Sequence, residues 1–352
     1  MERFFMKTLF TGNIYNVADP ENLLEAWREF LLGKRSKTDV HEFSLRLMDN
    51  LLSLRDDLLH HIYRHGGYQA FTISDPKPRH IHKAAVRDRV LHHAIYRTFY
   101  PFFDKTFIAD SFSCRIGKGT HRAIQRFAVF GRRASRNHTR TCWVLKCDIK
   151  KFFASIDHAT LTEIIRSYLP DPGLRWLLGE VIGSFSSTAP GKGLPLGNLT
   201  SQLLVNIYMN EFDQFVKHRL KVKYYVRYAD DFVITSSDRR ELEDLILPIQ
   251  AFLAERLKLE LHPGKVSIAT IASGVDFLGW VHFPDHRVLR TATKRRMFRG
   301  IGASKGTKET VQSYRGLLSH GNAKKLWKKV EDAAGLAGGW MGVGTRGPSS
   351  FG

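Results

Sequence analysis

The chain alternates between helical and strand-like patterns of hydrophobic positions. Leucine, tryptophan and phenylalanine recur at helical spacing over residues 21–63, with an interruption at 33–37 that is rich in glycine, lysine and arginine. Asp238 is the expected N-cap of a later helix. Amphipathic spacing predicts further helices over 86–100, 199–220, 238–258 and 309–332, the last broken at Gly321-Asn322.

Strand patterns are fewer and lie around acidic residues. Residues 143–149 combine β-branched and aromatic side chains and end near Asp148. Residues 223–236 predict two short strands around an acidic tip, as in a β-hairpin. A short strand pair is expected around 276–283, and the Gly/Ser-rich end of the chain, 333–352, is expected to be disordered.

The composition indicates a globular, strongly basic protein. Of its 352 residues, 43% are hydrophobic and 25% charged, and the formal net charge is +20. This composition excludes an intrinsically disordered chain. A protein that neutralises phosphates gains affinity by releasing counterions, so the charge favours a nucleic-acid partner. A merely well-solvated basic surface is the alternative.

Cysteine and histidine usage gives no metal or disulfide pattern. Cys114, Cys142 and Cys147 form no C-x-x-C pair, so neither a zinc ribbon nor a disulfide framework is expected. Solvated or phosphate-facing roles are expected for the histidines, among them His60, His61, His65, His80, His82, His92 and His93. The start, MERFFMKTLF, does not fit a signal peptide, and no apolar run approaches transmembrane length. A cytoplasmic location without membrane contact is expected.

Three aspartates are the main candidates for chemistry. Asp230 and Asp231 sit side by side at the hairpin tip, where adjacent carboxylates raise each other's pKa unless a cation is present. A solvated Asp-Asp turn would explain the dipeptide alone. The apolar strands around it, and an upstream strand ending in Asp148, favour three carboxylates within reach of hard cations. Two such ions a few ångströms apart are typical of phosphoryl transfer in polymerases.

Five motifs then occur in the order found in one enzyme family. They are KPRHIHKAAVRDRVLHHAI, KCDIKKFFASID, GLPLGNLTSQ, YADD, and LHPGK with FLGW. In this order they resemble the motifs of prokaryotic reverse transcriptases, over roughly residues 20–330. The resemblance implies RNA-directed DNA synthesis and an α+β right-hand polymerase fold, with fingers, an antiparallel-sheet palm and a helical thumb.

The resemblance also implies a metal site. Asp148 and Asp230 match the principal ligands, Asp231 the third carboxylate, and Ile149 offers a backbone group. The implied cofactors are two Mg²⁺ ions, with Mn²⁺ able to substitute. Lys265 resembles the lysine that protonates departing pyrophosphate. Asp157 matches no ligand position and is expected at the surface or as a helix cap.

Substrate-binding residues follow from the same motifs. Phe153 matches the aromatic steric gate that excludes a ribonucleotide 2′-hydroxyl, although an ordinary core phenylalanine is the alternative. Arg87 and Arg89 are weaker candidates, because they can pair with surface acids. The implied dNTP-binding residues are Lys77, Arg79, Lys150, Phe153 and Leu196. The implied primer and template contacts are Gly197, Gln202, Tyr228, Phe277, Leu278, Gly279, Trp280, Lys324, Lys325 and Lys328.

These matches predict five parts of the chain. They are an N-terminal helical extension (1–60), fingers with part of the palm (61–145), a palm with the catalytic site (146–285), a thumb (286–332) and a disordered tail (333–352). The basic helical segment near the C-terminus, within 309–332, suits the shallow minor groove of an RNA–cDNA hybrid. It would suit a solvated helix almost as well.

One loop distinguishes subclasses of the family. Group II intron enzymes have a loop sequence similar to QGxxxSP at this position. This chain has Leu196-Gly197-Asn198-Leu199-Thr200-Ser201-Gln202 instead. That loop resembles the reverse transcriptases of diversity-generating retroelements, which copy a template RNA with frequent errors at adenines. A small basic accessory protein, forming a hetero-oligomer, is implied by this resemblance. An antiphage defence or group II intron-like enzyme, and a catalytically silent RNA-binding scaffold, are the alternatives.

Overall fold

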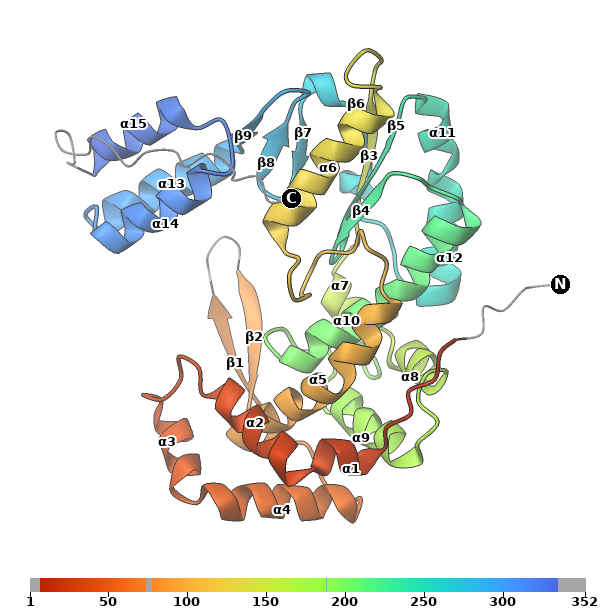
Figure 1. Ribbon diagram of the computed structural model, residues 1–352, viewed down its shortest axis with the longest axis vertical. Helices are drawn as coiled ribbons and strands as arrows, with labels where there is room; N and C mark the ends of the chain where they lie inside the picture. The colour runs from red at the N-terminus through yellow and green to blue at the C-terminus, as the bar shows by residue number, and fades with distance from the viewer. Residues whose placement is uncertain (1–6, 74–77, 188, 335–352) are drawn as a thin grey trace, which may run out of the picture. The chain divides into compact units, whose positions relative to one another are not determined.

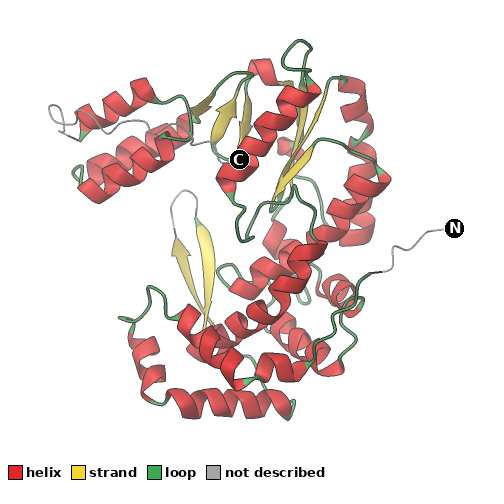
Figure 2. Ribbon diagram, viewed as in Figure 1, coloured by secondary structure: helices red, strands yellow, loops and turns green. Residues whose placement is uncertain are grey.

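The computed structural model describes residues 7–73, 78–187 and 189–334 (Figure 1). The chain forms two compact units that divide between Ile271 and Ala272. Both units contain helices and antiparallel strands (Figure 2), so the α+β class expected from the sequence is confirmed. Lys77 and residues 335–352 of the expected tail lie outside the described residues. Within the described ranges, no helix is long and apolar enough to cross a membrane.

The N-terminal helical pattern is confirmed, with its interruption after Phe30. The helices are α1 (Ile14–Ala18), α2 (Pro20–Phe30), α3 (Thr38–Leu45) and α4 (Leu47–Leu59). The Asp19 carboxylate caps α2 by accepting a hydrogen bond from the Asn22 amide (3.0 Å), and Pro20 occupies the first helical position. The buried Trp27 and Phe30 lie on α2, which packs against α5 (Val86–Thr106).

Helix α5 is longer than the expected 86–100. It continues through Pro101, and Phe103 in the added stretch is fully buried. Burial of this ring offsets the backbone hydrogen bond that proline removes. Before α5, β1 (Tyr68–Ile73) and β2 (Arg79–Ala84) form an antiparallel hairpin. The sequence did not predict these strands, because their side chains are mostly exposed and no alternating apolar pattern marks them.

Two long helices expected from the sequence are interrupted. The 199–220 segment is α10 (Leu199–Gln214) followed by a π-helical turn, Phe215–Arg219. The 238–258 segment divides at Leu245 into α11 (Arg239–Asp244) and α12 (Ile246–Leu257). Asp238 caps α11, as expected, by accepting from the Arg240 amide (2.8 Å). The remaining helices of the first unit are α6 (Thr120–Ala134), α7 (Phe152–Ser155), α8 (His158–Arg166) and α9 (Pro172–Gly183).

A four-stranded antiparallel sheet forms the centre of the first unit. Its order is β4-β5-β3-β6, with β4 (Tyr225–Tyr228), β5 (Asp231–Ser236), β3 (Trp143–Asp148) and β6 (Ser267–Thr270). The β3 strand and the 223–236 hairpin are therefore confirmed. The ring of Phe232 lies 5.1 Å from that of Phe212 on α10, and α6 packs against β4 and β5. These helices thus pack against the sheet. The acidic residues lie at one end of the sheet, where β3 and β4 end.

The second unit is a small sheet with three helices. The sheet has the order β7-β8-β9, with β7 (Val275–Phe277), β8 (Trp280–His282) and β9 (Arg287–Leu289). The helices are α13 (Thr291–Ala303), α14 (Lys308–Leu318) and α15 (Lys324–Ala333), so the expected strand pair and the expected break at Gly321-Asn322 are confirmed. A Cβ atom on Gly321 would lie 2.0 Å from the Trp280 ring, which explains the glycine. The five-part division remains a proposal.

Candidate active site

Asp230 lies in the turn that joins β4 to β5. The connection is Ala229-Asp230, and Ala229 has a φ of 55°, a left-handed conformation that residues other than glycine rarely adopt. Tyr225 and Phe232 on the flanking strands are fully buried. The acidic turn is therefore attached to two core strands.

Asp148 ends β3 directly opposite Asp231 on β5. Directly paired residues of antiparallel strands point to the same face, and like charges in such a pair repel. The Ile149 amide donates to the Asp230 carbonyl (3.2 Å), and the His262 amide donates to the Asp148 carbonyl (2.8 Å). The structure thus brings the three expected aspartates to one end of the sheet.

The electrostatic environment of Asp230 opposes its ionisation. Burial raises the pKa of its carboxyl, and the nearby charge of Asp148 raises it further, while Lys265 and Arg79 oppose the shift. The Lys265 ammonium lies 2.8 Å from Asp148 Oδ1, so part of the negative charge is neutralised by the protein itself.

The donor set fits a divalent cation. Carboxylate and carbonyl oxygens are the ligands that Mg²⁺ prefers, and a cation would relieve the repulsion between Asp148 and Asp231. In the described ranges, no three histidine, cysteine, aspartate or glutamate side chains are grouped so that they could already hold a metal ion.

The expected nucleotide-binding residues lie on separate elements of the first unit. Arg79 is exposed at the start of β2. The Lys150 ammonium pairs with Glu260 (2.9 Å). Phe153 is half-buried beside Phe152, with ring centroids 5.6 Å apart. Its environment is compatible with a steric gate and with a core position alike.

The expected template loop is tied to the β1-β2 hairpin. The His82 amide on β2 donates to the Leu196 carbonyl (3.1 Å). Gly197 has a φ of 107°, and a Cβ atom there would lie 2.9 Å from Ile81. Gln202 is partly exposed in the first turn of α10. Tyr228 accepts a hydrogen bond from Thr120 Oγ1 (3.2 Å), which links the catalytic hairpin to α6.

The expected primer and template contacts in the second unit fall into three groups. Phe277 and Trp280 are buried in the core of that unit, so their rings support the turn between them, and their primer contact stays a prediction. Leu278 and Gly279 form the turn between them, with φ values of 51° and 86°. These two turn residues are partly exposed and leave the backbone accessible. Lys324, Lys325 and Lys328 are exposed on α15.

Several residues have partners that the sequence could only partly predict. Asp157 caps α8 by accepting from the Thr160 amide (2.9 Å), so its expected cap role is confirmed. Arg87 and Arg89 do pair with acids outside the site, namely Asp57 and Asp39.

The expectation of a solvated or phosphate-facing histidine is wrong for His92. This side chain is buried, with Nδ1 2.7 Å from Thr200 Oγ1 and Nε2 3.2 Å from His65. The His92 imidazole therefore links α5 to the start of α10 inside the protein.

Comparisons with known proteins identify the family. The family described as reverse transcriptase (RNA-dependent DNA polymerase) matches residues 73–282, which include the sheet and its aspartates. Protein YkfC of Escherichia coli K12 is 28% identical over 325 residues, covering 79% of this chain and 83% of YkfC. Group II intron-encoded protein LtrA of Lactococcus lactis subsp. cremoris is 23% identical over 276 residues, covering 59% of this chain and 44% of LtrA.

The architecture agrees with this match. Mixed helices and an antiparallel sheet with acidic residues at one end are consistent with the right-hand polymerase fold. The chain belongs to the reverse transcriptase family of RNA-directed DNA polymerases.

Proposed function

We propose that this chain makes cDNA by nucleotidyl transfer at the acidic end of the central sheet. The observation that carries the proposal is the direct pairing of Asp148 with Asp231 beside the turn that contains Asp230. Asp148 and Asp230, with the Ile149 carbonyl, would hold two Mg²⁺ or Mn²⁺ ions, and Asp231 would add a third carboxylate. When bound, such ions activate the attacking hydroxyl and stabilise the leaving oxygen.

The surrounding residues would bind and orient the substrates. The Arg79 guanidinium suits the oxygens of the incoming triphosphate, with Lys77 and the Lys150 backbone as further contacts. Lys265 would hold the proton that passes to pyrophosphate, since its ammonium already lies at the acidic end of the sheet. The Phe153 ring would exclude a 2′-hydroxyl. Gly197, Gln202 and Tyr228 would lie along the template strand, and Leu278 and Gly279 would support the primer.

Within the family, we propose the error-prone enzyme of a diversity-generating retroelement. The support is Leu196, whose backbone is held by β2 while its side chain is partly exposed. An amide at this position could hydrogen-bond to the template or nascent pair, whereas leucine can only pack. A hydrogen bond contributes about 1 kcal/mol, so its loss would cost several-fold in accuracy. The preference for errors at adenine comes from the family resemblance.

A group II intron-like enzyme is the second candidate, because LtrA matches over 59% of the chain. The accuracy of cDNA synthesis distinguishes the diversity-generating enzyme from the intron-like enzyme. cDNA copied from a defined RNA should carry frequent errors, mostly opposite adenine. Leu196→Gln should lower the error rate several-fold, and Leu196→Met, which keeps an apolar side chain, should not. Uniformly low error in the parent enzyme would contradict the diversity-generating role and favour the intron-like or defence alternatives.

The proposed partners are template RNA, the RNA–cDNA hybrid and a small basic accessory protein that helps hold the RNA. The formal charge of +20 supports the nucleic-acid partners. An accessory protein that is itself basic would bind this chain through shared RNA. Ribonuclease treatment should then separate the two, and a complex that survives complete RNA digestion would contradict that arrangement.

A further inference from the structure

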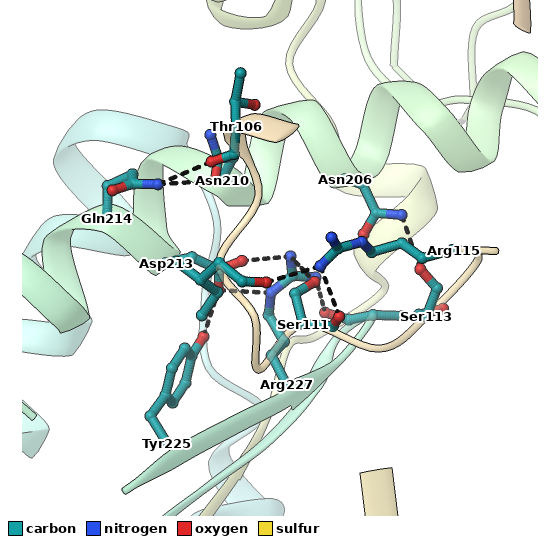
Figure 3. Close-up of polar contacts among 12 residues, drawn as sticks. Thr106, Ser111, Ser113, Arg115, Asn206, Asn210, Asp213, Gln214, Tyr225 and Arg227 are labelled. Carbon is teal, nitrogen blue, oxygen red and sulfur yellow. Dashed lines mark hydrogen bonds and ion pairs between the residues drawn. The ribbon is translucent and has the colours of Figure 1, made fainter. Parts of the chain in front are cut away.

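A buried ion pair joins the catalytic hairpin to α10 (Figure 3). The side chains of Arg227 on β4 and Asp213 on α10 are 1% and 0% exposed. Two parallel hydrogen bonds join them, from Arg227 Nε to Asp213 Oδ1 and from Nη2 to Oδ2, each 2.7 Å long. The Tyr225 hydroxyl donates to Asp213 Oδ1 (2.7 Å). The guanidinium is therefore fixed in position and orientation.

The same guanidinium reaches the turn that carries the aspartates. Arg227 Nη1 donates to the Ala229 carbonyl (3.0 Å), and Nη2 donates to Ser111 Oγ (3.0 Å). The Arg227 backbone also pairs with the segment before α6, through the Asp110 carbonyl (3.0 Å) and the Phe112 amide (3.0 Å). One side chain thus connects α10, the 110–112 segment and the turn.

The contact falls on a residue with an unfavourable backbone conformation. Ala229 has a φ of 55°, and its carbonyl belongs to the peptide bond that leads into Asp230. A strained residue persists only when its surroundings hold it in place. The hydrogen bond from Arg227 to the Ala229 carbonyl supplies such a restraint on the peptide that leads into Asp230.

We propose that Arg227 is a positioning residue for Asp230, which it orients through the Ala229 carbonyl while Asp213 anchors its guanidinium. The proposal rests on the function proposed above. Buried ion pairs are weak evidence for stability, since apolar residues of similar volume often replace them without loss. Apolar residues could fill this site, but they could not hold the Ala229 carbonyl.

The test compares Arg227→Lys with Tyr225→Phe. Lysine keeps the charge beside Asp213 but has a single nitrogen, which cannot bond Asp213 on two sides and also reach Ala229. Tyr225→Phe removes a hydrogen bond to the same carboxylate without touching the turn. The readouts are Mn²⁺ affinity by electron paramagnetic resonance, kcat and KM for dTTP on poly(rA)/oligo(dT), and the thermal unfolding midpoint without metal.

Arg227→Lys should weaken Mn²⁺ binding and lower kcat by about tenfold or more, with KM for dTTP within about twofold of the parent. Tyr225→Phe should keep both Mn²⁺ affinity and kcat within about twofold, even at an equal loss of thermal stability. Equal losses in the two variants, or parent-like metal binding in a folded Arg227→Lys protein, would overturn the proposal.

A second variant covers the case in which Arg227→Lys does not fold. Asp213→Leu, Tyr225→Phe and Arg227→Met, combined with Ser111→Ala, remove both charges and the buried hydroxyls bonded to them, so that only the Ala229 carbonyl loses its bond to Arg227. This protein should fold, but its Mn²⁺ affinity should remain lower than that of the parent. Parent-like Mn²⁺ affinity in this variant would overturn the proposal. A parent enzyme that makes no DNA would instead contradict the proposed function, so the two failures are distinguishable.

Discussion

The ammonium of Lys265 lies 2.8 Å from Asp148 Oδ1, at the end of β3. The segment that carries Lys265 also binds the backbone of Asp148. His262, three residues earlier, donates its amide to the Asp148 carbonyl (2.8 Å). The Pro263–Lys265 3₁₀ turn and its N-cap residue, His262, therefore place both a backbone donor and a cation on one aspartate. A lysine in this position can compete with a metal ion for Asp148 and can also deliver a proton.

Because of these two roles, one substitution of Lys265 should have opposite effects on Mn²⁺ affinity and on the rate of nucleotide addition. Lys265→Gln should tighten Mn²⁺ binding several-fold, because the competing charge is lost. It should also slow nucleotide addition by about 10- to 100-fold, the range of a lost general acid. Lys265→Arg keeps the charge but is a poor acid, so it should bind Mn²⁺ like the parent and still react slowly. Single-turnover rates for both variants equal to the parent rate would refute the proton-donor role.

Phe153 should control the choice between deoxyribonucleotides and ribonucleotides. The half-buried ring can exclude a 2′-hydroxyl by its volume, and its carbonyl, which accepts from the Leu194 amide (2.8 Å), is unaffected by side-chain truncation. Phe153→Ala should lower discrimination about tenfold or more, equivalent to about 1.4 kcal/mol per tenfold. Phe153→Tyr retains the ring and should discriminate like the parent. Unchanged rNTP/dNTP ratios with reduced thermal stability would make Phe153 a core residue.

The lysines of α15 should contribute to the salt dependence of RNA binding. Lys324, Lys325, Lys328 and Lys329 are exposed, while Val330 on the same helix is buried. Each phosphate contact adds about 0.7–0.9 to the log–log slope of affinity against salt. Replacing all four lysines by glutamine should flatten that slope by up to about 3, and replacing them by arginine should preserve it. A slope that the glutamine variant does not change would show that α15 is merely a solvated helix.

His92 should make stability depend on pH. Burial, and then the neighbouring His65, lower the pKa of its imidazole to about 3, against an ordinary value of 6.5. Between these values the unfolded chain binds the extra proton, so the free energy of unfolding falls as the pH drops below 6.5. Denaturant titrations should show a loss of about 1–2 kcal/mol between pH 6.5 and 5 that His92→Asn reduces. The exposed His41→Asn should not reduce it, and equal effects of the two substitutions would contradict this explanation.

Local patterns were sufficient to predict the catalytic strands. β3 and the β4-β5 hairpin are rich in buried β-branched and aromatic residues, with acids at the end of β3 and at the start of β5, so sequence alone indicated both the strands and their acidic ends. The β1-β2 hairpin was missed because its exposed strands carry no such alternation. The division of the 238–258 helix at Leu245 was also missed, since the hydrophobic pattern continues across it.

The buried polar residues could not be predicted because their partners are distant in the sequence. Asp213 lies among the apolar positions of α10, where an acid would ordinarily face solvent, and its partner Arg227 is on β4. His92 meets Thr200 only after α5 and α10 have packed together. Such pairs form only in the tertiary structure, so the helical or strand periodicity of hydrophobic residues cannot predict them.

Primer extension with the hairpin aspartates removed tests the central claim most directly. The parent protein, supplied with an RNA template, a DNA primer, dNTPs and Mg²⁺, should extend the primer. Asp230→Asn with Asp231→Asn should abolish extension and leave RNA affinity within about twofold, because the metal ligands and not the basic surfaces are lost. Extension by the double variant would contradict the assignment of the site. Failure of the parent itself, with RNA binding intact, would favour the RNA-binding scaffold.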